Sequence, residues 1–267
     1  MQMDFTITMY KKLLSGVLEA GYALQTMEEF IETPLNKVFV LRHDVDERPH
    51  NALKLAEAES EMGIRSTYYF RILKISYDPT IIKAIADLGH EIGYHYEDYA
   101  LANGNLEEAI SSFKDNLELF RQFYPVKTVC MHGSSMSKYD NRELWRHYKL
   151  SDFGIIGEPY LSVDYSKVFY LTDTGRCWDG GNYSVRDTVD NAFDLSFHRT
   201  SDIIDSFMEE GFPDQVILQS HTLWTDSLKE WLWLEGREKV RNQLKMVVVR
   251  IPFLKKIAYR LIHFYSK

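Results

Sequence analysis

The segment from Val38 to Asp46, with the sequence VFVLRHDVD, constrains the fold more than any other stretch of the chain. Its apolar, β-branched first half contains no turn residue and predicts a buried strand. The strand ends in Asp44 and Asp46, which face the same side because side chains alternate along an extended chain. Two carboxylates held together repel each other unless a cation or a shared proton offsets them. Acids at the carboxyl end of a strand are typical of α/β active sites, and the alternative is a pair of turn or helix-capping residues.

Strand and helix patterns alternate along the rest of the chain. We expect a helical hairpin over residues 5–32, and further helices at 49–63, 79–89, 106–123, 140–148 and 203–208. We expect strands at 38–46, 66–72, 91–95, 128–131, 153–156, 168–171 and 216–219. This alternation predicts an α/β protein with a parallel sheet or barrel. No linker, repeat or low-complexity segment divides the chain, so a single domain over 1–267 is the simplest expectation.

The composition excludes several classes of protein. The chain has 267 residues, of which 45% are hydrophobic and 26% charged, as in soluble globular proteins. A net charge of −8 argues against general nucleic-acid binding. Cys130 and Cys177 lie far apart in no paired motif, which excludes a disulfide framework and a thiolate zinc site. Because no signal-peptide pattern opens the chain and no apolar run reaches roughly 20 residues, we expect a cytoplasmic protein.

Polar residues follow four of the apolar strands at the point where each strand ends. These residues are Asp44 with Asp46, His95, His132 and His221. A single histidine in such a place is usually a hydrogen-bonded structural residue, but four strands ending this way predict a polar cluster at the carboxyl mouth of a barrel. Imidazole and carboxylate are ligands of zinc and similar ions, so the cluster predicts a divalent metal site, with zinc as the expected metal.

Three motifs resemble those of the polysaccharide deacetylases, the NodB-like or carbohydrate esterase 4 family. They are Leu41–Asp46 (LRHDVD), Gly89–His95 (GHEIGYH) and Leu218–Trp224 (LQSHTLW), and the resemblance covers about residues 36–235. The middle motif is the most specific of the three. The family fold is an irregular, incomplete (β/α) barrel of about seven parallel strands, which agrees with the alternation described above.

The resemblance implies a metal-dependent hydrolase that removes an N-acetyl, or sometimes O-acetyl, group from a sugar. Asp44 would be the general base, Asp46 and His95 metal ligands, and His221 the general acid. The metal would polarise the acetyl carbonyl and lower the pKa of a water molecule. Asp44 would take the proton of that water and His221 would protonate the leaving amine. The roles of the two aspartates could be exchanged, because the family's aspartates are adjacent and Val45 separates these two.

The middle motif departs from the family pattern at one position. The family has a second histidine four residues after the first, and this chain has Tyr99 there. A third ligand would then come from Glu97, our first candidate, or from His132; a third possibility is that metal binding has been lost. Two further histidines lie out of the inward-facing register and are weaker candidates, His43 and His90.

Four residues are candidates for substrate binding. Ser134 lies in a small, polar segment after the strand that ends at His132, and Trp224 follows His221. Trp178 could stack on a sugar and Arg176 could hold an anionic group such as a phosphate. For the segments around Ser134 and Trp178 the alternatives are an ordinary helix-capping loop and a tryptophan packed beneath its own loop.

The carboxyl-terminal segment 247–267 has a basic amphipathic pattern in an otherwise acidic chain. It would either lie on an anionic membrane surface or pack its apolar side on the barrel. Membrane contact would favour a lipid-linked substrate. We therefore divide the domain into a helical cap (1–32), a core (36–235) and a basic extension (236–267).

The leading hypothesis is a cytoplasmic sugar deacetylase. Its substrate would be a nucleotide-linked or lipid-linked precursor of a surface polysaccharide such as lipopolysaccharide. Two alternatives remain: an inactive relative that binds carbohydrate or acts as a scaffold, as Tyr99 suggests, and an Asp-x-Asp nucleotide-sugar transferase or aspartate-nucleophile phosphatase. The second alternative leaves the histidines unexplained.

Overall fold

The computed structural model describes residues 3–134, 137–179, 189–190 and 192–250, with side chains to residue 244. Seven strands form one sheet in which every pairing is parallel. They are β1 (Ala23–Gln25), β2 (Val38–Val45), β3 (Thr67–Phe70), β4 (Glu91–Tyr96), β5 (Val129–Met131), β6 (Phe169–Thr172) and β7 (Gln215–His221). The order is β5-β4-β3-β2-β7-β6, and β1 pairs with the first residues of β2. The terminal strands β5 and β6 do not pair in the described chain, so the sheet is the incomplete α/β barrel that we expected.

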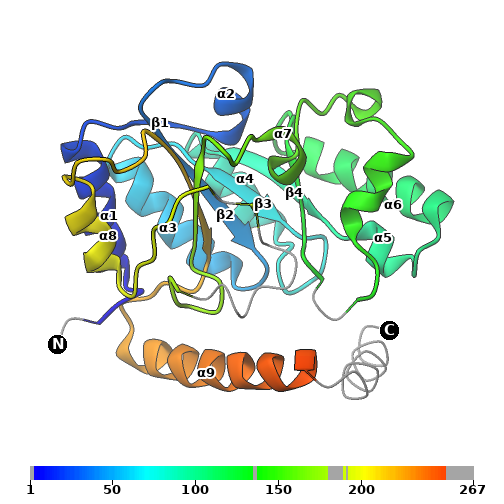
Figure 1. Ribbon diagram of the computed structural model, residues 1–267. Coiled ribbons are helices and arrows are strands. Elements are labelled where there is room, and N and C mark those ends of the chain that lie inside the picture. Colours follow the sequence, from blue (N-terminus) through cyan, green and yellow to red (C-terminus); the bar gives the residue numbers. More distant parts are fainter. Residues whose placement is uncertain (1–2, 135–136, 180–188, 191, 251–267) are drawn as a thin grey trace.

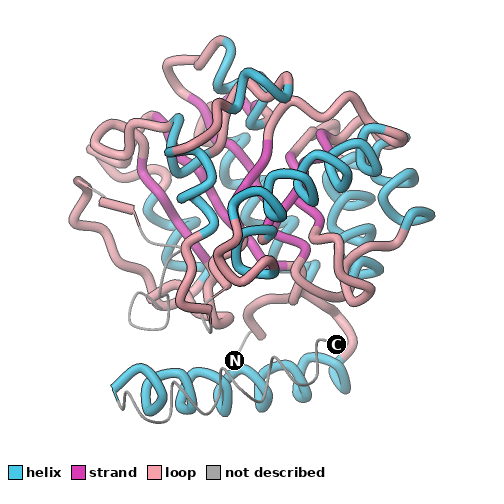
Figure 2. The backbone as a smooth tube through the Cα atoms, turned by 90° about the vertical axis from the view of Figure 1, so that its right-hand side faces the viewer, coloured by secondary structure: helices cyan, strands magenta, loops and turns pink. Residues whose placement is uncertain are grey.

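Helices flank this sheet (Figure 1). They are α1 (Ile7–Glu19), α2 (Met27–Glu32), α3 (Pro49–Glu61), α4 (Pro79–Asp87), α5 (Asp98–Leu101), α6 (Leu106–Arg121), α7 (Pro159–Ser162), α8 (Thr200–Ser206) and α9 (Leu228–Arg250). In both Figure 1 and Figure 2, α9 runs along the lower edge of the molecule. Within the described part of the chain, none of these helices combines the length and apolarity that a bilayer crossing needs.

Several expected elements differ from those observed. The amino-terminal hairpin contains a strand, β1, because Ala23–Gln25 pairs with the start of β2. Residues 153–156 form no strand; Phe153 ends a 3₁₀ helix, Leu150–Phe153, and Gly154 adopts a positive φ of 67°. The helix expected at 140–148 is a 3₁₀ helix, Asn141–Arg146. The last helix begins at Leu228 and continues through the expected boundary at 235–236, while residues 251–267 lie outside the described residues.

Alternation along β2 separates two cores. Phe39 and Leu41 face the surrounding helices and belong to the larger hydrophobic cluster. Val38 and Val40 face the opposite side, where they join a smaller cluster that includes Tyr69, Tyr170 and Ile217 from neighbouring strands. This smaller cluster fills the interior of the incomplete barrel near the start of β2. Beyond this cluster, the next inward-facing side chains along β2 are polar, namely Arg42 and Asp44.

A polar network is buried on the helix-facing side of the sheet, around Glu59 of α3. His43 Nε2 lies 2.7 Å from Glu59 Oε1, and Tyr10 donates a hydrogen bond to the same oxygen. Ser66 and Tyr68 donate to Oε2 at 2.5 and 2.8 Å. Burial alone raises the pKa of Glu59, but attraction to His43 and these hydrogen bonds outweigh it and lower the pKa to about 2. The network thus stabilises the charged form of a fully buried carboxylate.

Gly93 permits the close packing of β3 against β4. It pairs with Tyr69, and a Cβ atom at this position would clash with two ring carbons of Tyr69 and lie 3.0 Å from the carbonyl oxygen of Thr128. The ring cannot move easily, since its hydroxyl group is hydrogen-bonded to the Thr128 hydroxyl at 2.8 Å. A glycine is therefore required at this inward position.

We expect Gly93→Ala to lower the free energy of unfolding by about 1–3 kcal/mol, because the added methyl group overpacks the barrel interior. Gly236→Ala is the matched control, since a Cβ there has no neighbour within 4 Å and the position lies within α9. It should raise stability by up to about 1 kcal/mol. Urea unfolding measures both, and equal effects of the two substitutions would contradict the packing argument.

Glu59 should contribute to acid sensitivity. Its pKa is depressed in the folded protein, so its contribution is fully present above the unfolded value of 4.5 and is lost as the pH falls towards 2. Over that range the loss should amount to about 3 kcal/mol. Urea unfolding of the wild type and Glu59→Gln at pH 7, 4.5 and 3 tests this. A pH dependence as steep in the variant as in the wild type would assign the acid sensitivity to other carboxylates.

Candidate active site

The candidate site is formed by inward-facing side chains at the carboxyl ends of the strands. β2 contributes Asp44 and, one residue beyond its end, Asp46. β4 contributes His95, β7 contributes His221, and His132 follows the last residue of β5. Parallel strands bring these ends to one edge of the sheet, as the sequence predicted. The register places Asp44 directly beside His221.

Asp44 is held by two neighbouring side chains. Arg42, two residues earlier on the same face of β2, donates from Nε to Oδ1 at 2.9 Å and from Nη2 to Oδ2 at 2.6 Å. Gln219 of β7 donates to Oδ2 at 2.9 Å. Burial raises the pKa of Asp44, but attraction to Arg42 and His95 outweighs it, so the net pKa lies below the usual value. Asp44 is therefore an oriented, ionised carboxylate.

Asp46 lies between two imidazole rings. Its Oδ1 atom is 3.4 Å from His95 Nε2 and 3.6 Å from His132 Nε2. This oxygen is buried and makes no hydrogen bond with any described residue. Burial raises the pKa of Asp46, but attraction to His132, His95 and Arg71 places the net value well below the usual range. A buried anionic oxygen that faces two ring nitrogens without a hydrogen bond is an arrangement that a divalent cation would complete.

Both imidazole rings are oriented by hydrogen bonds on their far sides. His95 Nδ1 lies 3.0 Å from the carbonyl oxygen of Cys130, which can only accept, so Nδ1 carries the proton. His132 Nδ1 lies 3.0 Å from Glu97 Oε2. In each ring Nδ1 is engaged in this way, and Nε2 faces Asp46. A carboxylate or carbonyl behind a histidine is the usual support of a metal ligand.

Glu97 lies behind His132 rather than beside Asp46. Its Oε1 atom accepts from Arg71 Nε at 2.7 Å, while Oε2 contacts His132. Burial raises the pKa of Glu97, but His132 and then Arg71 outweigh it and bring the pKa to about 2. Both oxygens of our first candidate for the third ligand are therefore engaged, and His132 is the better placed of the two candidates.

A second set of potential ligands overlaps this one. Atoms of Asp44, His95 and Cys130 lie within 4.8 Å of one another, and all three residues are buried. Cys130 pairs with His95 across β4 and β5, which explains the proximity. Three hydrogen bonds already engage the oxygens of Asp44, whereas Asp46 Oδ1 has none. We therefore favour the set of Asp46, His95 and His132.

His221 is held by Asp173, the first residue after β6. The His221 Nδ1 atom lies 2.8 Å from Asp173 Oδ1. Asp173 Oδ2 accepts from the indole of Trp224 at 3.0 Å and from Ser220 at 2.9 Å. Burial lowers the pKa of His221, but the bond to Asp173 and the charges of Asp173, Asp46 and Asp44 outweigh it and raise the pKa to about 9. His221 is thus an imidazolium at neutral pH.

The predicted substrate-binding residues have different surroundings. Ser134 lies near the site, 3.1 Å from His132 Nδ1. Trp224 is fully buried and contacts Asp173. Arg176 contacts the carbonyl oxygens of Trp231 and Phe5.

Trp178 stacks on Phe5 and donates to Thr200 at 3.0 Å, so it packs beneath its loop, as the alternative reading proposed. The Tyr99 ring packs against Tyr139, with 5.4 Å between the ring centroids.

The sequence analysis missed Arg42 and Asp173, although both had detectable signals. Arg42 precedes Asp44 by two residues and therefore shares its face of the strand. Asp173 directly follows an apolar strand, as the predicted site residues do. The histidines considered weak candidates, His43 and His90, lie on the helix-facing side in the Glu59 network.

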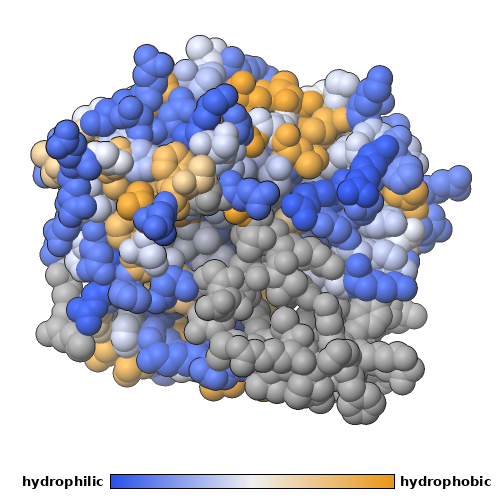
Figure 3. Space-filling view, in the orientation of Figure 1, coloured by the Kyte–Doolittle hydropathy of each residue, from blue (hydrophilic) through white to orange (hydrophobic). Residues whose placement is uncertain are grey.

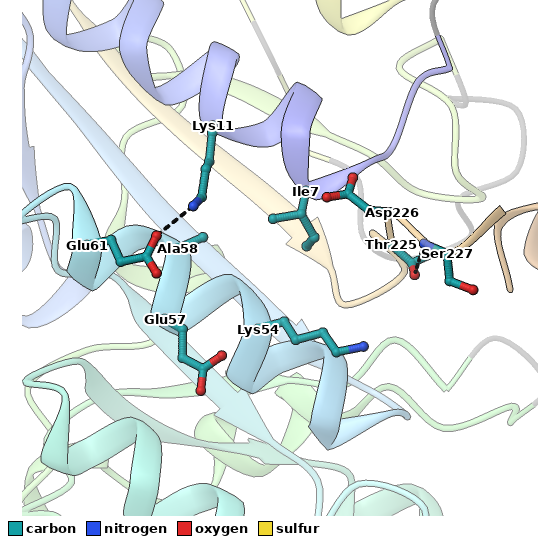
Figure 4. Close-up of a pocket in the computed structure, with 9 residues that line it drawn as sticks. All are labelled: Ile7, Lys11, Lys54, Glu57, Ala58, Glu61, Thr225, Asp226 and Ser227. Carbon is teal, nitrogen blue, oxygen red and sulfur yellow. Dashed lines mark hydrogen bonds and ion pairs between the residues drawn. The ribbon is translucent and has the colours of Figure 1, made fainter.

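A pocket of about 360 Å³ lies elsewhere, between α1, α3 and the segment before α9 (Figure 4). Its charged lining mixes Lys11 and Lys54 with Glu57, Glu61 and Asp226. Lys11 and Glu61 pair across it at 2.6 Å. None of the strand-end residues described above lines this pocket, so it is separate from the candidate site.

Solved structures similar to this chain include three carbohydrate-active enzymes. The family 4 carbohydrate esterase from Streptomyces lividans in complex with acetate is 14% identical, over 79% of this chain and 90% of that chain, with a TM-score of 0.41. The peptidoglycan deacetylase PdaC from Bacillus subtilis is 14% identical, over 79% of this chain and 86% of that chain, with a TM-score of 0.42. A Streptococcus mutans CE4 esterase is 14% identical, over 82% of this chain and 87% of that chain, with a TM-score of 0.42.

Neither the protein-family models nor the curated proteins contain a match to this chain. The similar structures are too distant to assign a function.

Proposed function

We propose that this chain is a divalent-metal-dependent hydrolase that removes an acetyl group from a sugar. The observation that supports it most is Asp46 Oδ1, a buried anionic oxygen without a hydrogen bond that faces His95 and His132. Asp46, His95 and His132 would hold the metal, for which zinc suits two imidazoles and a carboxylate. When bound there, such an ion would polarise the acetyl carbonyl and lower the pKa of water.

Asp44 and His221 are suited to the two proton transfers. Arg42 and Gln219 orient the Asp44 carboxylate, whose lowered pKa keeps it ionised as a general base that accepts a proton from water. Asp173 orients His221, whose raised pKa keeps it protonated as a general acid that delivers a proton to the leaving nitrogen or oxygen. Neighbouring groups whose pKa values are driven apart in this way are typical of acid–base pairs.

The ligand set explains how Tyr99 could replace a histidine without loss of the metal. His132 would supply the third ligand from the end of β5, the strand beside β4. Glu97 would support His132 from behind, which keeps its carboxylate in the site although not on the metal. An inactive binding protein would not need the oriented pair of Asp44 and His221.

The substrate would be an acetylated sugar carried on a nucleotide or a lipid, as a precursor of a surface polysaccharide. Ser134 beside His132 is the predicted substrate-binding residue that lies nearest to the ligand set. Membrane contact through residues 247–267 remains part of this proposal, on the strength of their basic amphipathic sequence. The enzyme would then work in the cytoplasm, either free or at the membrane surface.

We expect the purified protein to bind about one equivalent of zinc or a similar ion, as measured by elemental analysis and by thermal stabilisation on metal addition. Asp46→Ala should abolish this binding. His132→Ala should weaken it by at least about 100-fold and Glu97→Gln by about 10–100-fold, since Glu97 acts through His132.

Cys130→Ser is the matched control for the metal site. It should leave metal affinity nearly unchanged, because Cys130 belongs to the overlapping set that we do not favour. Loss of metal in this variant, with retention in His132→Ala, would transfer the site to Asp44, His95 and Cys130. Absence of metal binding in the wild type would overturn the hydrolase proposal.

Acetate release from acetylated amino sugars should fall as the pH rises through about 9, because His221 then loses its acidic proton. Asp173→Asn should shift this alkaline limb to lower pH, since it removes the charge that raises the pKa of His221. Ser220→Ala is the control, because it removes a different bond to Asp173 and leaves the one to His221. His221→Ala should lower kcat by about 10²–10⁴-fold. An unshifted alkaline limb in Asp173→Asn would exclude His221 as the acid.

A further inference from the structure

The outward face of α9 carries large apolar side chains that are more than half exposed. Their exposed fractions are 57% for Leu228, 58% for Leu232, 52% for Trp233, 59% for Val240 and 57% for Leu244. At 3.6 residues per turn these five side chains spread over about 160° of the helix circumference, so together they occupy one half of the helix surface. Figure 3 shows hydrophobic side chains at the lower edge of the molecule, where Figure 1 places α9. We call Leu228, Leu232, Trp233, Val240 and Leu244 the α9 stripe.

The opposite face of α9 is attached to the loops at the carboxyl edge of the sheet. Leu234, Glu238 and Asn242 are buried on that face. Asn242 donates to the carbonyl oxygen of Gly175 at 2.8 Å. Arg237 donates to Glu47 Oε2 at 2.8 Å, and Glu47 is the residue directly after Asp46. These contacts fix the rotation of α9, so the α9 stripe faces away from the domain.

Charge is distributed very unevenly along the chain. Residues 228–267 contain ten lysines and arginines against three acids, a net charge of +7, whereas residues 1–227 carry −15. After Glu238 the chain has no further acid. Trp233 of α9 also lies close to two guanidinium groups, those of Arg48 at 4.8 Å and Arg237 at 4.7 Å from the ring centroid. Exposed apolar side chains among cationic groups are complementary to a layer that has an apolar interior and an anionic surface.

We propose that the α9 stripe docks on an anionic lipid bilayer, with its apolar side chains among the acyl chains and the basic residues of α9 at the headgroups. Buried apolar area and attraction of basic residues to anionic lipids both contribute to the binding of a helix in the plane of a membrane interface. A second copy of the chain is the less suitable occupant. A symmetric contact through α9 would bring two segments of net charge +7 together.

Membrane docking would also narrow the class of substrate, and this consequence rests on the proposed function. Since α9 is bonded to Glu47, next to Asp46, the membrane would lie at the same edge of the sheet as the candidate site. The enzyme would then act on a sugar whose carrier is a lipid, with the sugar at the headgroup level. A water-soluble nucleotide carrier would gain nothing from this position.

Sedimentation of the full chain with lipid vesicles tests the docking. The protein should bind vesicles that contain phosphatidylglycerol and should bind pure phosphatidylcholine vesicles much more weakly, with binding reduced by high salt. The double variant Leu232→Glu with Val240→Glu should bind at least about tenfold more weakly, because it places two carboxylates in the apolar layer. Leu35→Glu is the matched control: Leu35 is 44% exposed and precedes β2 at the opposite edge of the sheet, so binding should not change.

Folding and the proposed activity are measured separately on the same samples. The double variant should keep the wild-type melting temperature and the same release of acetate from soluble acetylated sugars, since the α9 stripe lies outside the candidate site. Equal vesicle binding by the wild type and the double variant would overturn the docking, as would equal binding to neutral and anionic vesicles. So would a wild-type dimer in light scattering that the double variant converts to monomers, because the α9 stripe would then be a subunit interface. None of these results would affect the proposed hydrolysis, whose failure would appear as absent metal or acetate.

Discussion

The compensation of buried charge at the end of β2 is the interaction on which the candidate site depends. Asp44 and Asp46 project from one face of the strand into the barrel interior, where two unpaired carboxylates would repel each other strongly. Arg42 neutralises the first through two parallel hydrogen bonds from the same strand face. Beside the second lie imidazoles, with the Nε2 atoms of His95 and His132 at 3.4 and 3.6 Å from Oδ1 and that of His221 at 4.0 Å from Oδ2. The two acids therefore differ in their surroundings: Asp44 is already paired and would suit the proposed role of an oriented base, whereas a cation beside Asp46 would complete its surroundings.

The same strand carries a second buried polar pair on its opposite face. His43, between Leu41 and Val45 in the outward register, meets Glu59 of α3 at 2.7 Å within the network that also binds Tyr68 and Ser66. Removal of His43 would leave the buried Glu59 carboxylate with fewer polar partners in the core, which is destabilising. β2 is thus attached to α3 on one side and to the candidate site on the other. This attachment holds β2 in a fixed position, so Asp44 and Asp46 keep the geometry that their proposed roles would require.

The sequence predicted the fold well because apolar periodicity and strand-end polarity are local signals. The strands β2, β3, β4, β5, β6 and β7 and the gathering of Asp44, His95, His132 and His221 followed from them. The failures came from long-range effects. β1 is three residues long and is a strand only because it pairs with β2. The placement of Glu97 behind His132, and of Trp178 under Phe5 rather than towards substrate, depends on tertiary packing that spacing does not encode. Arg42 could have been found, since a cation two residues before an acid on a strand faces the same way.

If His132 is the third ligand, as we propose, its position shows how a ligand set could persist when its sequence motif does not. In the family pattern that the middle motif resembles, both histidines belong to one segment, four residues apart, but position 99 here is a tyrosine that packs on Tyr139. β4 and β5 are parallel neighbours, with His95 beside Cys130. A side chain two residues beyond Cys130 faces the same interior and reaches Asp46 from the next strand. The barrel presents several strand ends to one point, so a ligand can be supplied from any of them. A missing motif residue is therefore weak evidence for a lost metal site, and the neighbouring strand ends must be searched first.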